Sequence, residues 1–181
     1  MDPFGYTNRI FWVFEGAMDE WAKCSVPNHC SAAGNVVIYD TTHGTNHARM
    51  KLGLFVTVGA EGNSIILAGS LLQDETWEMF YWAFSKFADA FIVGPTAIFT
   101  DEDTAMEKAL NELSGTGNGD AESHPFWDGS WGTEPLPPTK HLLCIFHISK
   151  NLYKHLRTLF VSQMEVRGQG RGGRARVPQI E

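Results

Sequence analysis

Two aspartates occupy positions from which they could hold metal ions. Asp40 ends the β-branched run 35–40 (Asn-Val-Val-Ile-Tyr-Asp), and Asp101 directly follows a second run, residues 96–100 (Thr-Ala-Ile-Phe-Thr). A single carboxylate binds Mg²⁺ weakly, whereas two carboxylates at adjacent strand ends can bridge a pair of ions. We therefore expect the two carboxylates to lie about 4–7 Å apart. A second interpretation stays open, because strands commonly end in acidic residues where the chain meets water.

The elements that must position these aspartates follow one another in a recognisable order. Hydrophobic patterning and turn residues predict strands over 35–40, 51–58, 64–71, 96–100 and 141–145, and helices over 76–91, 103–113 and 147–164. Asp103 is a suitable N-cap for the second helix. The first helix has an apolar face made of Trp77, Phe80, Tyr81, Phe84, Phe87 and Ala88. Three strands in a meander, a helix, a strand and a helix predict an α/β fold, an RNase H-like mixed sheet with flanking helices.

The chain divides into three parts of different composition. Residues 1–34 form an aromatic-rich lead-in, and residues 35–165 form the predicted α/β domain. The domain contains a Gly-, Pro- and Ser-rich insertion at 114–139, whose Trp127 and Trp131 could stack on bases or pack back onto the domain. Residues 166–181 are an Arg/Gly tail, which we expect to be disordered.

Charge and composition exclude several classes of protein. The 181 residues carry a net charge of −7, and three cysteines are too few for a disulfide framework. The tail contributes +3 (four arginines and one glutamate), so the remainder carries −7 − 3 = −10. Such an acidic body argues against a general nucleic-acid-binding protein. The N-terminus has no apolar signal core, so we expect a protein that is not secreted and has no membrane partner.

Four motifs in order resemble the Mutator-like element (MULE) transposase domain, which also occurs in plant far-red-impaired-response type proteins. Residues 39–46 (Tyr-Asp-Thr-Thr-His-Gly-Thr-Asn) resemble its first-aspartate motif, and residues 99–106 (Phe-Thr-Asp-Glu-Asp-Thr-Ala-Met) its second. Residues 67–77 (Leu-Ala-Gly-Ser-Leu-Leu-Gln-Asp-Glu-Thr-Trp) are similar to its "ALL-x-x-E-T" stretch. Residues 141–152, which contain Cys144 and His147, resemble its Cys-x-x-His segment.

The resemblance implies a DDE-type recombinase, in which two aspartates and a later glutamate hold two divalent ions for DNA strand cleavage and transfer. By resemblance, Asp40 and Asp101 are catalytic residues and ligands of Mg²⁺ or Mn²⁺. Cys144 and His147 have a structural or DNA-positioning role, although a buried cysteine at a strand end and a histidine at a helix start explain them equally simply. The implied location is the nucleus. The implied partners are DNA, bound weakly or indirectly by this chain, and other transposase copies in an oligomer.

The third acid of the resemblance is not identified in this sequence. Glu165 directly follows the last predicted helix, and Glu181 is the final residue of the Arg/Gly tail, so neither matches the family's spacing. We therefore expect a fold that is incomplete at its C-terminal end and a chain without catalytic activity. Two alternatives stay open: a domesticated, catalytically silent, DNA-associated transcriptional regulator, or a non-functional fragment that would remain in the cytosol.

Overall fold

The computed structural model describes residues 7–24, 36–42, 44–59, 61–91, 94–118, 124, 127, 138–154 and 156. The chain separates into two units, residues 1–144 and 145–181. In the first unit the elements are β1 (Arg9–Val13), α1 (Ala17–Cys24), β2 (Val36–Thr42), β3 (Lys51–Val58), β4 (Ser64–Leu72), α2 (Trp77–Ala90), β5 (Ala97–Thr100), α3 (Thr104–Leu113) and β6 (Lys140–Leu143).

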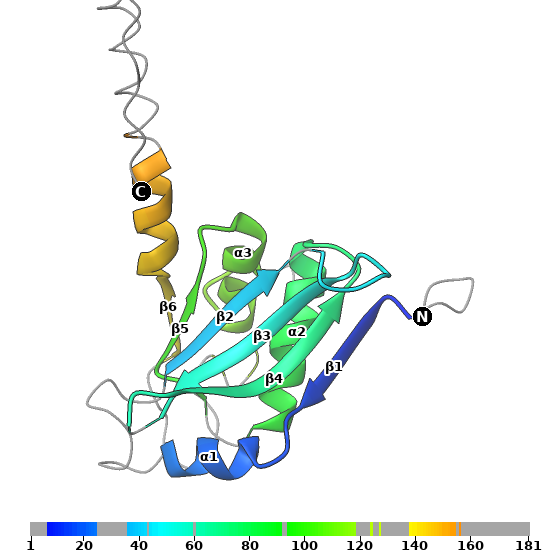
Figure 1. The fold of residues 1–181 in the computed structure, drawn as a ribbon, viewed down its shortest axis with the longest axis vertical. Helices are drawn as coiled ribbons and strands as arrows, with labels where there is room; N and C mark the ends of the chain where they lie inside the picture. The colour runs from blue at the N-terminus through cyan, green and yellow to red at the C-terminus, as the bar shows by residue number, and fades with distance from the viewer. Residues whose placement is uncertain are drawn as a thin grey trace, which may run out of the picture. The chain divides into compact units, whose positions relative to one another are not determined.

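The six strands form one mixed sheet in the order β1-β4-β3-β2-β5-β6 (Figure 1). β2, β3 and β4 are the antiparallel meander predicted from the sequence, and β1 adds an antiparallel edge strand beside β4. β5 runs parallel to β2, and β6 runs parallel to β5. The predicted α/β class, a mixed sheet with flanking helices, is therefore confirmed.

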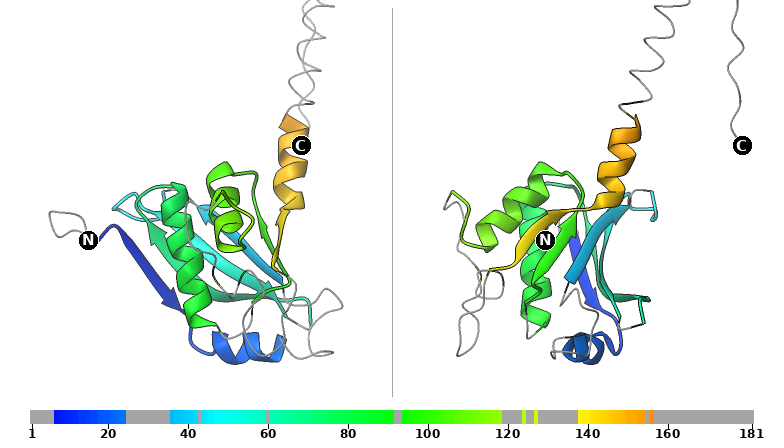
Figure 2. Two further views of the ribbon diagram at one scale, coloured as in Figure 1. Left: turned by 180° about the vertical axis from the view of Figure 1, so that it is seen from behind. Right: turned by 90° about the vertical axis from the view of Figure 1, so that its left-hand side faces the viewer.

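α2 and α3 lie on one face of the sheet (Figures 1 and 2). The core between them and the sheet is strongly aromatic. Phe55 of β3 stacks on Phe87 of α2 with ring centroids 4.5 Å apart, and Tyr39 of β2 meets Phe84 edge to face at 5.0 Å. All four of these side chains are fully buried. Because large aromatic rings bury extensive apolar area, this layer holds β2 and β3 firmly against α2.

Two segments outside the predicted elements contribute to this core. Trp21 of α1 is 2% exposed and meets Phe87 and Phe91 edge to face. Trp127, from the insertion, is fully buried and its indole N–H donates to the carbonyl of Phe84 at 3.3 Å. Of the two interpretations of the insertion tryptophans, packing onto the domain is therefore confirmed for Trp127, whereas Trp131 lies outside the described residues.

The structure corrects details of the predicted elements. Trp77 and Tyr81 are half-buried and not fully buried, and Lys108 Nζ of α3 lies over the Trp77 ring, 4.2 Å from its centroid. β6 ends at Leu143, earlier than expected, and helical structure begins at residue 145. The predicted cap of α3 is confirmed, since the Asp103 carboxylate accepts hydrogen bonds from the backbone N–H groups of Ala105 and Met106 at 2.8 and 3.0 Å.

The second unit contains a helix over residues 145–154, which continues at residue 156. Ile145 and Phe146 at its start are 78% and 66% exposed. In the described part of the chain, no helix has both the length and the hydrophobicity needed to cross a bilayer.

Candidate metal centre at the ends of β2 and β5

The strand register brings Asp40 and Asp101 to the same edge of the sheet. The parallel pairing of β2 with β5 matches Val36 with Ala97 and Ile38 with Phe99. Continuing this register by two residues places Asp40 opposite Asp101. Neighbouring strands lie about 4.8 Å apart, and residues in register on parallel strands point to the same face of a sheet. Both aspartates follow the paired part of these parallel strands: Asp40 lies within β2, two residues before its end and not at the end as predicted, and Asp101 directly follows β5. The short distance expected between their carboxylates stays a prediction.

Asp40 and Asp101 differ in their exposure to solvent. Asp40 is exposed, whereas its neighbour Tyr39 is fully buried against α2. Because side chains alternate along a strand, Asp40 belongs to the face of β2 opposite α2. Asp101 is half-buried, and its Oδ1 atom is shielded from water. One carboxylate is thus open to an incoming ligand, and the other is held more deeply at the end of β5.

Helix N-termini also converge on this edge. α2 begins at Trp77, shortly after β4 ends at Leu72, and α3 begins at Thr104, shortly after β5 ends at Thr100. β2, β4 and β5 run in the same direction, so their carboxyl ends meet the starts of both helices (Figure 1). The N-terminus of a helix carries a partial positive charge that favours carboxylates and phosphates. This edge of the sheet can therefore accommodate negative charge.

A polar network joins the segment next to Asp40 to two other elements. The hydroxyl of Thr41 donates to Glu75 Oε1 at 2.9 Å, and Lys51 Nζ lies 3.5 Å from Glu75 Oε2. Thr41 is on β2, Lys51 begins β3, and Glu75 lies just before α2. The side chains of Lys51 and Glu75 are 24% and 29% exposed, so the ion pair is partly shielded from solvent. Sequence reasoning missed this network, although Thr41 and Glu75 both lie within stretches that resemble the family's motifs.

Tyr39 lies beneath the same end of β2. Its hydroxyl is 3.1 Å from the hydroxyl of Ser70 on β4. Burial raises the pKa of Tyr39 far above its ordinary value, and the negative charges of Glu75 and Asp40 raise it further. The Tyr39 ring crosses β3 at Gly53, where a β-carbon would overlap the tyrosine hydroxyl. Glycine at this position is therefore required for the close approach of the ring.

Thr100 and His141 form polar contacts next to Asp101. The hydroxyl of the fully buried Thr100 donates to the carbonyl of Asp101 at 3.0 Å, and His141 Nε2 lies 2.7 Å from the same hydroxyl. Burial lowers the pKa of His141, and the charge of Glu107 acts in the opposite direction. His141 and Glu107 line a pocket of about 320 Å³ next to this strand end, together with Glu102, Asp103, Thr104 and Leu143.

Cys144 and His147 belong to different units of the structure. Cys144 is a half-buried free thiol whose backbone N–H donates to the carbonyl of Thr100 at 2.6 Å, which extends the pairing of β6 with β5. His147 is half-buried in the helix over 145–154, and its ring meets Phe146 edge to face at 5.5 Å. Their predicted structural or DNA-positioning role stays a prediction.

The donor chemistry of the two aspartates fits Mg²⁺ or Mn²⁺. Both ions prefer oxygen ligands, and Mg²⁺ is commonly bound by one or two carboxylates while it keeps several waters. Asp40 and Asp101 provide two carboxylates, and Asp40 is the one that is exposed to solvent. Among the described residues, no group of three or more His, Cys, Asp and Glu side chains is arranged to hold a metal ion.

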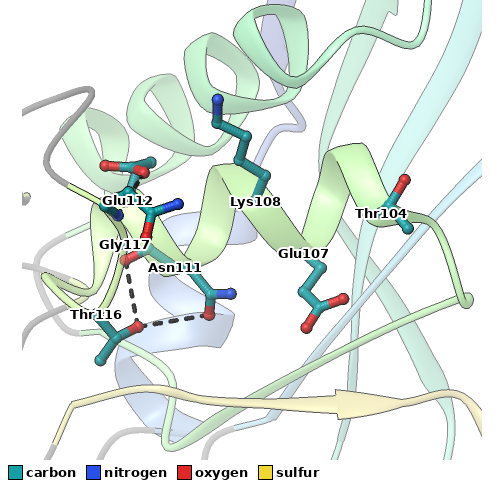
Figure 3. Close-up of a pocket in the computed structure, with 8 residues that line it drawn as sticks. Thr104, Glu107, Lys108, Asn111, Glu112, Thr116 and Gly117 are labelled. Atoms are coloured by element: carbon teal, nitrogen blue, oxygen red, sulfur yellow. Dashed lines mark hydrogen bonds between the residues drawn. The ribbon is translucent and has the colours of Figure 1, made fainter.

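A second pocket, of about 260 Å³, lies along α3 and has a structural explanation (Figure 3). Thr116 donates to the carbonyl and side-chain oxygens of Asn111 at 3.3 and 3.4 Å. Glu112 is 2% exposed and accepts a hydrogen bond from the backbone N–H of Asn118 at 3.0 Å. A β-carbon at Gly117 would overlap the Glu112 carboxylate. These contacts fold the chain back over the end of α3, so we assign the pocket no catalytic role.

Comparison with known proteins tests the resemblance to the MULE transposase domain. Residues 36–115, which include both Asp40 and Asp101, match the family model of the MULE transposase domain. The resemblance to MULE transposases is confirmed. The MULE match covers β2 to α3, which are the elements that place the two aspartates at one edge of the sheet.

Plant proteins are among the similar curated sequences. Protein FAR1-RELATED SEQUENCE 11 of Arabidopsis thaliana is 27% identical over 130 residues, 71% of this chain and 16% of that protein. Putative protein FAR1-RELATED SEQUENCE 10 of the same plant is 34% identical over 92 residues, 50% of this chain and 13% of that protein. Protein FAR-RED IMPAIRED RESPONSE 1, also from Arabidopsis, is 24% identical over 133 residues, 73% of this chain and 13% of that protein. The chain spans less than a fifth of the length of these relatives.

Proposed function

We propose that this chain is a transposase-derived domain with an RNase H-like fold, whose Asp40 and Asp101 bind Mg²⁺ or Mn²⁺. The observation that carries the proposal is the parallel pairing of β2 with β5 up to Ile38 and Phe99, because Asp40 and Asp101 each follow this last pair by two residues. The order of a three-strand meander, a helix, a strand, a helix and a further strand supports the RNase H-like assignment.

The ancestral reaction of this site is metal-dependent cleavage and transfer of DNA strands. When bound, divalent ions would supply activation of water or of a DNA 3′-hydroxyl and neutralisation of charge on the phosphodiester. The exposed Asp40 is accessible to a ligand from solvent, and the half-buried Asp101 is fixed to β5 through the backbone contact of Thr100. The N-termini of α2 and α3 favour the negative charge that gathers at this edge.

We propose further that these 181 residues by themselves do not cleave DNA. A two-metal site needs enough ligands to hold both ions and to align the nucleophile. Neither Glu165 nor Glu181 matches the spacing of the family's third acid, which supports this proposal. The matches to FAR-RED IMPAIRED RESPONSE 1 and related proteins favour a second candidate, a catalytically silent, DNA-associated regulator in the nucleus.

Titration with Mn²⁺ tests the metal site directly. We expect Asp40→Asn and Asp101→Asn each to weaken Mn²⁺ binding by roughly tenfold or more, since even residues outside the ligand shell are typically worth about 10- to 100-fold in metal affinity. The matched control is Asp19→Asn, which removes an exposed carboxylate on α1. Isothermal titration calorimetry at low ionic strength gives the affinities. Equal binding by the wild type and the two site variants would rule out the proposed centre.

Incubation with supercoiled plasmid DNA tests activity. We expect no nicking with Mg²⁺ or Mn²⁺. If purified protein nicks the plasmid and Asp40→Ala abolishes the nicking, the chain is an active enzyme and the proposed inactivity is wrong. DNA binding without nicking favours the regulator, and the absence of both metal and DNA binding favours a non-functional fragment.

A further inference from the structure

The end of β2 loses one of its two strand neighbours just before Asp40. Backbone pairing of β2 with β5 ends at the Ile38–Phe99 pair, whereas pairing with β3 continues to the Thr42–Leu52 pair. In the described residues, the segment 40–42 is therefore held by strand pairing on its β3 side alone. A segment that pairs on one side is held by fewer backbone hydrogen bonds, so side-chain contacts contribute more to its position.

Glu75 makes such a contact. It accepts the hydroxyl hydrogen bond of Thr41 at 2.9 Å and pairs with Lys51 at 3.5 Å. Thr41 directly follows Asp40, and Lys51 begins β3, the strand on which the segment still pairs. Hydrogen bonds to an ionised carboxylate are stronger than those between neutral groups, and partial burial reduces their screening by water. Glu75 thus ties the end of β2 to the start of β3 and to the segment that leads into α2.

We propose that Glu75 is a positioning residue of the metal centre, which fixes the Asp40 carboxylate by anchoring the neighbouring Thr41. The inference rests on the proposed function, because it concerns the same cation site. Groups that orient metal ligands commonly affect affinity without contacting the ion.

The faces of β2 explain why Glu75 acts through Thr41 and does not itself bind the ion. Successive side chains of a strand point to opposite faces, so Thr41 shares the face of the buried Tyr39, and Asp40 belongs to the other face.

The test measures Mn²⁺ affinity and melting temperature for substitutions on both sides of the contact. Thr41→Val removes the hydroxyl but keeps the branched shape, and Glu75→Gln removes the charge that attracts Lys51. We expect each to weaken Mn²⁺ binding roughly tenfold. The double variant should be no weaker than the single variants, because both disrupt the same contact. Thr41→Ser, which keeps the hydroxyl, should bind within about twofold of wild type.

Glu78→Gln is the matched control. Glu78 is an exposed glutamate in the first turn of α2, so its replacement removes the same charge from nearly the same place. We expect this variant to bind Mn²⁺ as the wild type does. Equal weakening by Glu78→Gln would show a general effect of charge and overturn the inference.

The remaining outcomes separate this inference from the proposed function. If Asp40→Asn abolishes Mn²⁺ binding while Thr41→Val and Glu75→Gln bind normally, the metal centre stands and the positioning role of Glu75 is wrong. If Glu75→Gln abolishes binding and Thr41→Val has no effect, Glu75 is itself a ligand, and the positioning role is again wrong. If the variants melt at a lower temperature but keep their Mn²⁺ affinity, the contact is merely structural. If wild-type protein does not bind Mn²⁺, both proposals fail together.

Discussion

At the scale of single residues, the partial burial of His141 makes stability depend on pH. Burial lowers the pKa of His141 below its ordinary value of 6.5. The unfolded chain therefore binds a proton at His141 at a higher pH than the folded chain does. Where the unfolded state binds more protons, stability falls as the pH falls. The contribution of neutral His141 to the free energy of unfolding is fully present above about pH 6.5, and it is lost as the pH drops through the folded-state pKa.

Replacing His141 should therefore flatten the pH dependence. We expect wild-type protein to lose more free energy of unfolding between pH 7.5 and pH 5.5 than His141→Gln loses. Urea unfolding at the two pH values measures this difference. His47→Gln removes an exposed histidine that follows β2 and serves as the control. An identical pH dependence of wild type and His141→Gln would show that the buried imidazole does not carry the effect.

At the scale of elements, α3 depends on the cap that Asp103 provides. The Asp103 carboxylate accepts the backbone N–H groups of Ala105 and Met106, which have no partners within the helix. Loss of such a cap typically costs about 1 kcal/mol, with a range of about 0.5–2 kcal/mol. We expect Asp103→Ala to lower the free energy of unfolding by this amount, measured by urea denaturation. Glu102→Ala, at the exposed neighbouring residue, should have a much smaller effect; an equal loss would contradict the capping role.

At the scale of the whole molecule, charge limits how the chain binds DNA. Residues 166–181 carry +3 and the remainder carries −10. We expect weak, sequence-independent binding that depends on four arginines: Arg167, Arg171, Arg174 and Arg176. Each phosphate contact contributes about 0.9 to the slope of log affinity against log salt, so four contacts give at most about 3.6. A salt titration of wild type and of the variant with all four arginines replaced by alanine measures the slope. Equal slopes for the two proteins would show that residues other than these four arginines contact DNA.

Short-range patterns predict most of the elements between residues 35 and 113, whereas they do not predict β1 and α1 in the lead-in. The helix at Trp77–Ala90, the cap at Asp103 and the meander of β2, β3 and β4 follow from spacing and turn residues within a few positions. The order of elements also indicated that the strands before Asp40 and Asp101 are neighbours, and β2 and β5 do lie side by side in the sheet. The role of these aspartates is still a prediction.

The side-chain contacts around the candidate site depend on tertiary packing, and the sequence did not predict them. Thr41 and Glu75 are 34 residues apart in sequence, and Trp127 and Phe84 are 43 apart. The lead-in at residues 1–34 also supplied an edge strand, because Arg9–Val13 pairs with β4. No local pattern specifies such partners, since propensity and periodicity act over one or two turns, whereas these contacts form only when sheet and helices pack. The sequence therefore predicts the candidate ion-binding residues, whereas the contacts around them form only in the folded protein.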